Sequence, residues 1–428
     1  MEEASLGDGN ISLEEEALMT SEAEGDAAEV ATDLAEAERL IEVSDALEDL
    51  AVVADDIEEA TPTELQLIET VGQAAVAGSD VAPEEIVPAM EGFKGGRIAT
   101  ESIRDRARSI WEQIQRYLKQ IWEKIESFFY KLFGTVPSLR KRVAALRDKV
   151  DAKQGMKSEA KPMKMVGATY LSIAGTPVKN EGGLNKGLSD LEDAAKYVFG
   201  AYSDGVAARG ETIADALNKF DIKEAEKATA DLRDKMVAQK PPKMPGTASA
   251  NQSRFPGFTT YIGPALLGNH SLAAKQFNEG DGTSVLGALD KFRRAGVELI
   301  PTNEKAVAAA ANAEFSVMSL SAMNTALGHL DKILDLVEEF RRGKRTKDIN
   351  KSREAIKSAS SKATKAMEAA KTGDEEARTT VAYYRAMINF NAAYARWVQQ
   401  PAIPFSSSAL STVRATLNLI DKNLSTYK

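Results

Sequence analysis

The chain contains no cysteine and only two histidines among its 428 residues. The absence of thiols excludes disulfides, thiol nucleophiles and zinc–thiolate sites, and it fits a reducing compartment. His270 and His329 are far apart in the sequence, and neither has a second ligand at the spacing of a metal-binding helix. We therefore expect both histidines to be structural or surface residues, and we expect no metal and no cofactor.

The common catalytic motifs are also missing. The sequence has no Walker loop, no dinucleotide-binding glycine fingerprint and no nucleophile elbow. The segment NEGDGTS at 278–284 is similar to a cation- or phosphate-binding turn, but it lacks the later ligands of a calcium loop. We interpret it as a plain turn. We expect no catalytic residue and no enzymatic activity.

Long apolar runs are missing as well. No stretch of about 18 apolar residues is available to span a bilayer. The first ten residues, MEEASLGDGN, are acidic and polar, unlike the cationic start of a signal peptide. These absences predict a soluble intracellular protein.

Basic residues are scarce at the beginning of the chain. Residues 1–101, which we name the leader, hold 28 Asp and Glu but only three basic residues, Arg39, Lys94 and Arg97, a net charge of −25. Residues 102–428, the body, then carry a net charge of +15, although the whole chain has −10. Parts of opposite sign attract each other, and a basic body favours polyanions. A purely solubilising acidic tail is the alternative explanation of the leader.

We expect a mainly α-helical fold with minor β-strand content. The leader has no aromatic residue before Phe93, so it should form marginal helices that need a partner. A further short helix is expected to begin at 61–64, and the glycines of GFKGGR at 92–97 should loosen the backbone into an accessible linker. Apolar residues of the leader at helical spacing are Leu34, Leu40, Ile41, Leu47, Leu50 and Val53.

Residues 102–155 are predicted to form an amphipathic helical hairpin. They carry 13 basic and six acidic side chains. The first helix has an aromatic apolar face and ends at Gly134, and Pro137 opens a second, strongly basic helix over 139–150. The apolar face comprises Ile103, Ile110, Ile114, Tyr117, Ile121, Ile125, Phe128 and Leu132, and it is widened by Trp111, Leu118, Trp122, Phe129 and Phe133.

Residues 156–300 are predicted to form a mixed region. Helical spacing occurs at 184–220 and 223–239. Segments 166–175 and 257–268 mix β-branched and aromatic residues with Gly and Pro, which indicates short strands or ordered loops.

Residues 301–428 are predicted to form a helical bundle, with a helical pattern from residue 303. The segment 349–373 is basic, rich in alanine and poor in large residues, which indicates an exposed helix. Two more helices are expected at 376–398 and 407–425. A seam with steps of three and four should pack on a helix of the same chain or of another copy, which leaves a homo-oligomer open. This seam consists of Leu320, Met323, Leu327, Leu330, Leu334 and Val337.

Three environments suit the aromatic face of the helix at 103–133. Burial against the protein's own body is the commonest fate of such a face. The alternatives are a contact with another copy or another protein, and a membrane interface, which favours Trp and Phe flanked by Lys and Arg. In these two cases we expect contacts through Trp111, Trp122, Phe128 and Phe129, with the two tryptophans as membrane anchors.

Two basic clusters of the body suit phosphate groups. Each phosphate that a Lys or Arg neutralises releases counterions, which gives an affinity that depends on salt and not on sequence. A solvated charged face is the alternative for each cluster. We expect weak, non-specific DNA contacts through Arg140, Lys141, Arg142, Arg341, Arg342, Lys344 and Arg345.

The layout of roughly the first 150 residues resembles the internal head proteins of large tailed bacteriophages. The resemblance consists of an acidic helical leader, an Ala-x-Glu tripeptide in a loose segment, then ESI and a basic helix dense in Trp, Ile, Phe and Lys. It implies a propeptide that enters the assembling prohead and a prohead protease that cuts after Glu in Ser/Ala/Gly-x-Glu sequences. The cut would follow Ala99, Thr100 and Glu101 and leave Ser102 as the new N-terminus.

The same tripeptide pattern occurs elsewhere, so position must select the site. Five further matches lie in the leader and four in the body, where folding should hide them. Glu101 stands out because it coincides with the charge switch and follows the glycine-rich segment. The leader matches end at Glu14, Glu29, Glu48, Glu84 and Glu91, and the body matches end at Glu298, Glu354, Glu368 and Glu375.

The resemblance implies a non-enzymatic virion protein inside the phage head, present in the host cytoplasm during assembly. Its partners would be capsid or other inner-head proteins, the prohead protease and the packaged DNA. Three alternatives remain open from the residues. They are a prohead scaffold or core protein that is lost later, a membrane-active ejected protein acting through 103–133, and a cellular helical adaptor unrelated to phages.

Overall fold

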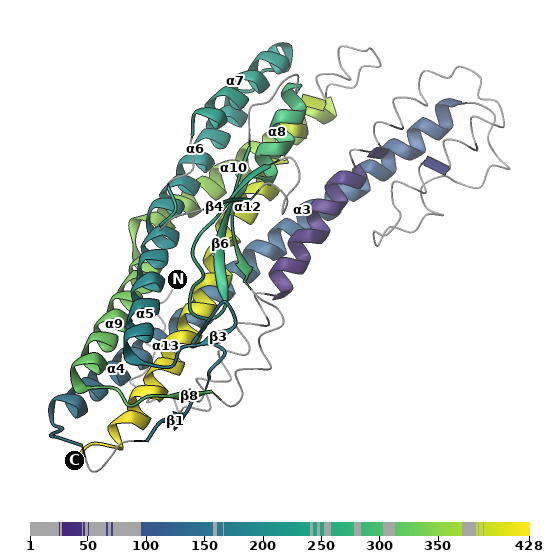
Figure 1. Cartoon of the computed structure of the whole chain (residues 1–428). Helices are drawn as coiled ribbons and strands as arrows, with labels where there is room; N and C mark the ends of the chain where they lie inside the picture. The colour runs from purple at the N-terminus through teal and green to yellow at the C-terminus, as the bar shows by residue number, and fades with distance from the viewer. Residues whose placement is uncertain are drawn as a thin grey trace.

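The structure is a computed structural model in which most of the chain is described. The described ranges are 28–44, 96–156, 161–165, 167–239, 243–245, 249–251, 258–277, 284–302, 313–369 and 389–428, with scattered positions between them. The fold is mainly helical with a few short strands, as the sequence predicted. Figure 1 shows the long helices side by side, with the largest sheet on one flank.

The first two long helices of the body lie end to end (Figure 1). They are α3 (Gly96–Gly134) and α4 (Val136–Asp151). Only Thr135 separates them, and its backbone angles, φ −82° and ψ −20°, are helical. The structure therefore differs from the predicted hairpin, because a helical hairpin needs a loop of roughly two to five residues. The basic helix continues from the aromatic one instead of folding back beside it.

The helices predicted over 184–220 and 223–239 are present. They are α5 (Glu181–Lys196), a π-helical turn η3 (Tyr197–Tyr202), α6 (Ser203–Asn218), the short 3₁₀ helix η4 (Ile222–Glu224) and α7 (Ala225–Ala238). Asn180 caps α5, because its side-chain oxygen accepts a hydrogen bond from the Gly183 backbone at 2.9 Å. The one-residue expansion in η3 lets α6 continue in the same direction as α5.

The mixed region contains a four-stranded antiparallel sheet with the strand order β4-β5-β6-β7. The helix α8 (Val285–Arg294) joins β6 to β7, and Ser284 caps it by accepting from Gly287. Its strands are β4 (Ser249–Asn251), β5 (Phe258–Ile262), β6 (His270–Phe277) and β7 (Gly296–Pro301). Two smaller pairs are β1 (Met163–Lys164) with β8 (Glu314–Phe315), and β2 (Ser172–Ile173) with β3 (Thr176–Pro177).

The C-terminal part is a helical bundle. It comprises α9 (Leu320–Arg342), α10 (Lys344–Ala369), α12 (Phe390–Gln399) and α13 (Ala402–Leu424). The helical pattern predicted from residue 303 begins at Leu320 among the described residues, because β8 precedes it. The seam residues of α9 from Met323 to Val337 are buried, and α9 packs on α4 and α5 of the same chain.

The prediction of an exposed helix over 349–373 is wrong for the described residues of α10. Ile349, Ser352, Ile356 and Ala359 are buried, and α10 packs closely along α6. Small side chains permit this approach: a Cβ atom on Gly210 of α6 would lie only 2.6 Å from the Cβ of Ser352. A lack of large residues therefore indicates close helix packing here, not exposure.

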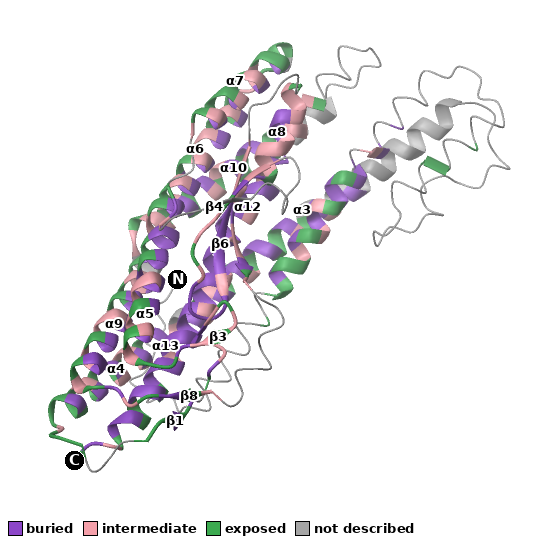
Figure 2. Cartoon of the chain, viewed as in Figure 1, coloured by how far each residue is buried: buried purple, intermediate pink, exposed green. Residues whose placement is uncertain are grey.

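The buried apolar residues form one continuous core that runs through the leader, the first helices and the C-terminal bundle. Figure 2 shows that α13 is buried along most of its length. Buried side chains of the leader join this core, and they are Val30, Leu34, Ala37, Leu40, Ile41, Val43, Leu47 and Leu50. Val53 and residues 61–64 lie outside the described part of the chain.

Candidate functional site

The helical residues 28–44, which we name the leader helix, dock on the body. The leader helix is the purple helix of Figure 1, and it lies beside α3. Its Val30, Leu34 and Ile41 side chains are almost completely buried in the common core. Each fully buried aliphatic side chain contributes about 1.5–3 kcal/mol. Packing on the body thus stabilises the leader helix, which was expected to need a partner.

The acidic side chains of the leader helix reach basic residues of the body at two places. At the first, Lys124 of α3 donates a hydrogen bond of 2.6 Å to Asp33 and lies 3.2 Å from Glu29. The hydrogen bond to Asp33 raises the pKa of Lys124 above its ordinary 10.5, against the opposing effect of partial burial. This contact joins the acidic leader to the first helix of the body.

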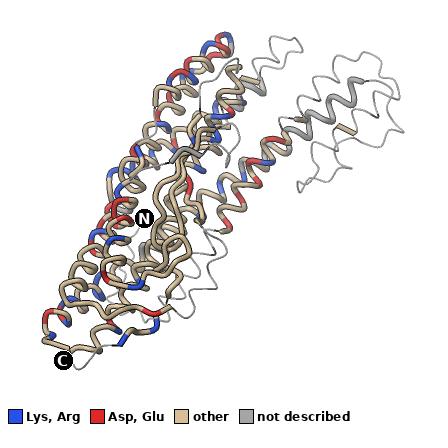
Figure 3. Tube along the Cα trace, viewed as in Figure 1, with Lys and Arg blue, Asp and Glu red and all other residues tan. Residues whose placement is uncertain are grey.

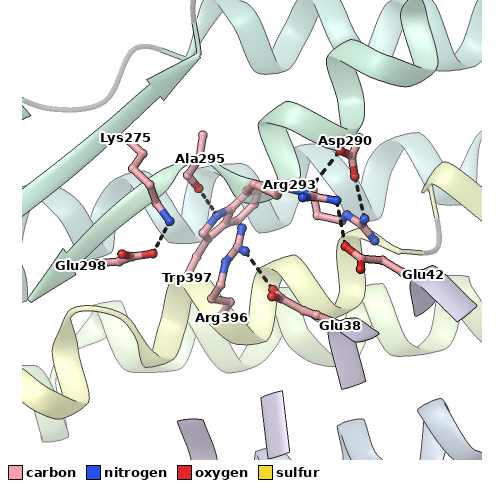
Figure 4. Close-up of polar contacts among 10 residues, drawn as sticks. Glu38, Glu42, Lys275, Asp290, Arg293, Ala295, Glu298, Arg396 and Trp397 are labelled. Carbon is pink, nitrogen blue, oxygen red and sulfur yellow. Dashed lines mark hydrogen bonds and ion pairs between the residues drawn. The ribbon is translucent and has the colours of Figure 1, made fainter. Parts of the chain in front are cut away.

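The second place is a group of three arginines, Arg293, Arg294 and Arg396, which we name the arginine cluster. Figure 4 labels Arg293 and Arg396. Arg396 Nη1 lies 2.9 Å from Glu38 Oε1, and Arg294 Nη2 lies 2.9 Å from Glu42 Oε1. The leader carboxylates thus pair with arginines that lie 358 and 252 positions further along the chain.

Two helix ends place the arginine cluster. Arg293 and Arg294 belong to the last turn of α8, and Arg396 belongs to the last turn of α12, where cations complement the helix dipole. Trp397 ties the two ends together, because its Nε1 donates a 2.6 Å hydrogen bond to the Ala295 carbonyl. The cluster is therefore part of the folded body and not a flexible addition to it.

Within the body, the arginine cluster has fewer carboxylates than cations. Arg293 and Arg294 share Asp290, at 2.6 Å and 3.2 Å, and Lys275 pairs with Glu298. Among the described residues, Arg396 pairs with one carboxylate, that of Glu38 in the leader. The leader thus completes the charge balance of the site.

A cavity of about 220 Å³ opens at the seam between the leader helix and the body. Its wall is formed by Glu38, Glu42, Phe258, Lys275, Arg293, Arg294 and Arg396. Two guanidinium nitrogens of these residues, Arg293 Nη1 and Arg396 Nη2, are buried and have no hydrogen-bond partner among the described residues. Buried N–H groups without an acceptor are costly, so these nitrogens would gain from an acceptor that reaches them when the neighbouring side chains move.

The sequence-predicted cleavage residues Ala99, Thr100, Glu101 and Ser102 lie in the first turns of α3. The expectation of a loose segment is therefore wrong for residues 96–102, which are helical, whereas 92–95 lie outside the described part. Helix α3, which carries the aromatic face, begins at Gly96, upstream of the charge switch at Glu101. The first α3 residue described as buried is Ile110.

The aromatic face of α3 points into the protein wherever its side chains are described. Trp122 and Phe128 are buried, and Phe129 is half-buried against the core. The ring centroids of Trp122 and Tyr394 are 6.0 Å apart, and Cζ of Arg353 lies 5.3 Å from the centroid of the Trp122 ring. Of the three environments considered for the aromatic face, these residues occupy the first, burial against the body. The side chain of Trp111 lies outside the described part.

The predicted DNA-contacting residues have mixed surroundings. Arg140 pairs with Asp335 and Glu338, Arg142 donates to Asn418, and Arg345 pairs with Asp204 and Glu339. Lys141 and Lys344 are exposed, whereas the side chains of Arg341 and Arg342 lie outside the described part. Figure 3 shows both charge signs interspersed along the body helices. Arg140, Arg142 and Arg345 thus already have partners within the fold.

The two histidines hold structural positions. His329 Nδ1 lies 2.7 Å from the buried Glu192 carboxylate, and His270 begins β6. Burial lowers the pKa of His270 below its ordinary 6.5. Among the described residues no helix has the length and apolar content needed to cross a membrane. No group of three or more metal-ligating side chains is found in that part either.

Sequence reasoning missed the arginine cluster. Arg293, Arg294 and Arg396 match no motif, and the leader carboxylates that pair with Arg294 and Arg396 lie hundreds of residues away. The only sequence signal was global: an acidic leader joined to a basic body.

Comparison with known families identifies the class as a phage virion structural protein. The matching family model describes the phiKZ-like phage internal head proteins and covers residues 14–422, so the chain belongs to this family. The match confirms the suspected family and extends far beyond the residues that carried the resemblance. The interpretation as a cellular adaptor is wrong. Searches of the curated proteins and of the solved structures each gave no match.

Proposed function

We propose that this internal head protein is made as a precursor and is matured by proteolysis. The leader accompanies the body into the assembling prohead, the prohead protease cuts after Glu101, and the body stays in the capsid with the genome. Its partners are capsid or other inner-head proteins, and the packaged DNA through non-specific contacts. The protein acts by binding and has no catalytic role.

The observation that carries this proposal is the charge pairing between leader and body. Glu38 and Glu42 pair with Arg396 and Arg294, and Asp33 pairs with Lys124. Carboxylates that occupy the body's cations keep these cations from binding nucleic acid during assembly. Removal of the leader changes the net charge by 25 units and leaves a basic protein.

Cleavage after Glu101 requires the beginning of α3 to unwind, because a protease binds an extended substrate. Helix termini open at much lower free energy than core segments. Glu101 is in the second turn of α3, and Ile110 is the first residue of this helix whose side chain is described. We expect the cut to require unwinding of only the first turns of α3.

Mass spectrometry of purified particles tests the proposal. We expect a peptide that begins at Ser102, at a position where the protease used to digest the sample does not cut. Glu101→Gln should abolish this terminus, whereas Glu91→Gln, at another Ala-x-Glu match in the leader, should leave it unchanged. An intact leader in mature particles would contradict the proposal. Abundance in proheads with loss from mature particles would identify a scaffold protein instead.

A membrane-active role has less support from the geometry. Trp122 and Phe128 lie in the core, so they reach a lipid surface only if α3 leaves the body. The body would have to unfold in large part for this to happen.

A further inference from the structure

We propose that the arginine cluster is a phosphodiester-binding site of the mature body, and that Glu38 and Glu42 occupy it in the precursor. This inference rests on the proposed removal of the leader. It assigns a specific place to the nucleic acid contact and a specific blocking role to two leader residues. The site is separate from the basic clusters at 140–142 and 341–345.

Removal of the leader changes the net charge of the site from neutral to positive. In the precursor, four cations face four carboxylates, namely Lys275, Arg293, Arg294 and Arg396 against Glu38, Glu42, Asp290 and Glu298. Without the leader, Asp290 and Glu298 remain as the carboxylates of the described site. The four cations then carry an excess of two positive charges, which attracts a polyanion.

The buried guanidinium groups suit an anion with several acceptor oxygens. Arg293 and Arg396 are largely buried, with side-chain exposures of 12% and 13%. Each has one buried guanidinium nitrogen without a partner among the described residues, and a ligand reaches this nitrogen only when the leader side chains move away. A phosphodiester offers two oxygens that share one negative charge, and the planar guanidinium fork matches them bidentately.

The spacing of the leader residues resembles that of a polyanion. Glu38 and Glu42 are one helical turn apart, about 6 Å along the helix axis. They engage two arginines that come from different helices, α12 and α8. The leader helix therefore presents a short row of negative charges to a site of two separated cations. Inside a phage head, the abundant ligand with rows of negative charge is the packaged nucleic acid.

The test uses the full-length chain, so that it does not depend on cleavage. The double variant Glu38→Gln/Glu42→Gln removes the blocking charges and keeps the apolar face of the leader helix. We expect a fluorescently labelled short DNA duplex to bind this variant roughly tenfold more tightly than wild type, equivalent to about 1.4 kcal/mol. The slope of log affinity against log salt should steepen by about 1.8, because two more phosphates are neutralised.

Two further variants separate this site from a general charge effect. Glu29→Gln/Asp33→Asn removes two charges from the same helix, next to Lys124, and should give no comparable gain. Addition of Arg396→Gln to the Glu38→Gln/Glu42→Gln variant should cancel the gain. Arg294→Gln serves as a second test, because its more exposed side chain contributes less to the fold.

Several results would overturn the inference. These are an equal gain in both double variants, no gain in either, or a gain that survives the loss of Arg396 and Arg294. A gain for inorganic phosphate alone, or for anionic lipid vesicles and not for the duplex, would also overturn it. If the gain occurs but particles retain residues 1–101, the site stands and the proposed maturation fails.

Discussion

Gly210 sets how closely α6 and α10 approach each other, and Gly210→Ala should destabilise the fold. The added Cβ would lie 2.6 Å from the Ser352 Cβ and 2.6 Å from a Tyr394 ring carbon. Neither neighbour can move away easily, because both are buried. We expect a loss of about 1–3 kcal/mol in the free energy of unfolding, measured with urea.

The matched control is Gly328→Ala in α9. A Cβ at Gly328 meets nothing within 4 Å. The substitution should stabilise the protein by up to about 1 kcal/mol, because alanine favours a helix over glycine. Equal effects at both glycines would contradict the role given to the α6–α10 contact.

Glu192 is a buried carboxylate whose contribution should depend on pH. Burial alone would raise its pKa, but hydrogen bonds from Lys196 and His329 and the charge of Lys332 outweigh burial and hold the pKa below 4.5. A lowered pKa in the folded state stabilises the fold above the unfolded pKa, and this stabilisation is lost as the pH falls through the lowered value.

Glu192→Gln should therefore lower the free energy of unfolding by about 1–3 kcal/mol at neutral pH. The difference from wild type should shrink as the pH falls from 4.5 through the lowered pKa, because Glu192 takes up a proton first in the unfolded chain and then in the folded one. Urea unfolding at a series of pH values measures this. Asp193→Asn, at an exposed ion pair with Lys196, should change stability by less than about 1 kcal/mol at every pH.

The leader helix has one face in the core and one in solvent, and a pair of identical substitutions tests this. Ala37 is completely buried and Ala35 is exposed, two positions apart and on opposite faces. Ala37→Glu should weaken docking by about 3–5 kcal/mol, because it buries an unpaired carboxylate. Ala35→Glu should have little effect. Hydrogen exchange of residues 30–43 reports docking, and equal protection in both variants would refute the described orientation.

Helical periodicity predicted the presence of individual helices well, but it predicted poorly which other elements they pack against. The spacing of Leu34, Leu40 and Ile41 predicted a marginal helix that needs a partner, and these three side chains are buried in the structure, because a period of 3.6 residues marks the face that meets a partner. The same logic failed for α10, whose buried face includes the small residues Ser352 and Ala359 beside two isoleucines. Close backbone approach leaves no hydrophobic signal in a sequence.

Connections and distant pairs were beyond the reach of the sequence. Gly134 and Pro137 predicted a reversal of the chain, but Thr135 adopts helical angles and the chain runs straight on. The pairing of Glu42 with Arg294 depends on how α8 is placed in the whole fold. Only the charge contrast between leader and body could be predicted. It indicated that acidic residues of the leader face basic residues of the body, but not which residues these are.

At the scale of the whole molecule, a single cut should not release the leader. Buried side chains such as Leu40 and Leu47 hold it to the common core independently of the peptide bond at Glu101. A site-specific protease sequence inserted at 92–95 permits a clean cut of the precursor. We expect both fragments to elute together in size-exclusion chromatography, even at high salt, because salt weakens ion pairs and not apolar burial.

The same cut in the Ala37→Glu variant should let the fragments separate. Separation in the wild-type chain at moderate salt would show that the ion pairs, and not the apolar face, dominate docking. Of the leader matches, Glu29 lies in the first turn of the leader helix and Glu48 follows its end at residue 44. Cuts at these positions shorten the docked segment, and we expect them to precede its loss.

Removal of the leader helix, as proposed, would expose the apolar surface of the body that now covers Val30, Leu34 and Ile41. The matured protein would then differ from its precursor in surface hydrophobicity as well as in net charge. Exposed apolar patches mark places where a protein associates with other molecules. The precursor would therefore be the less adhesive form, and the matured protein the form that its neighbours hold in place.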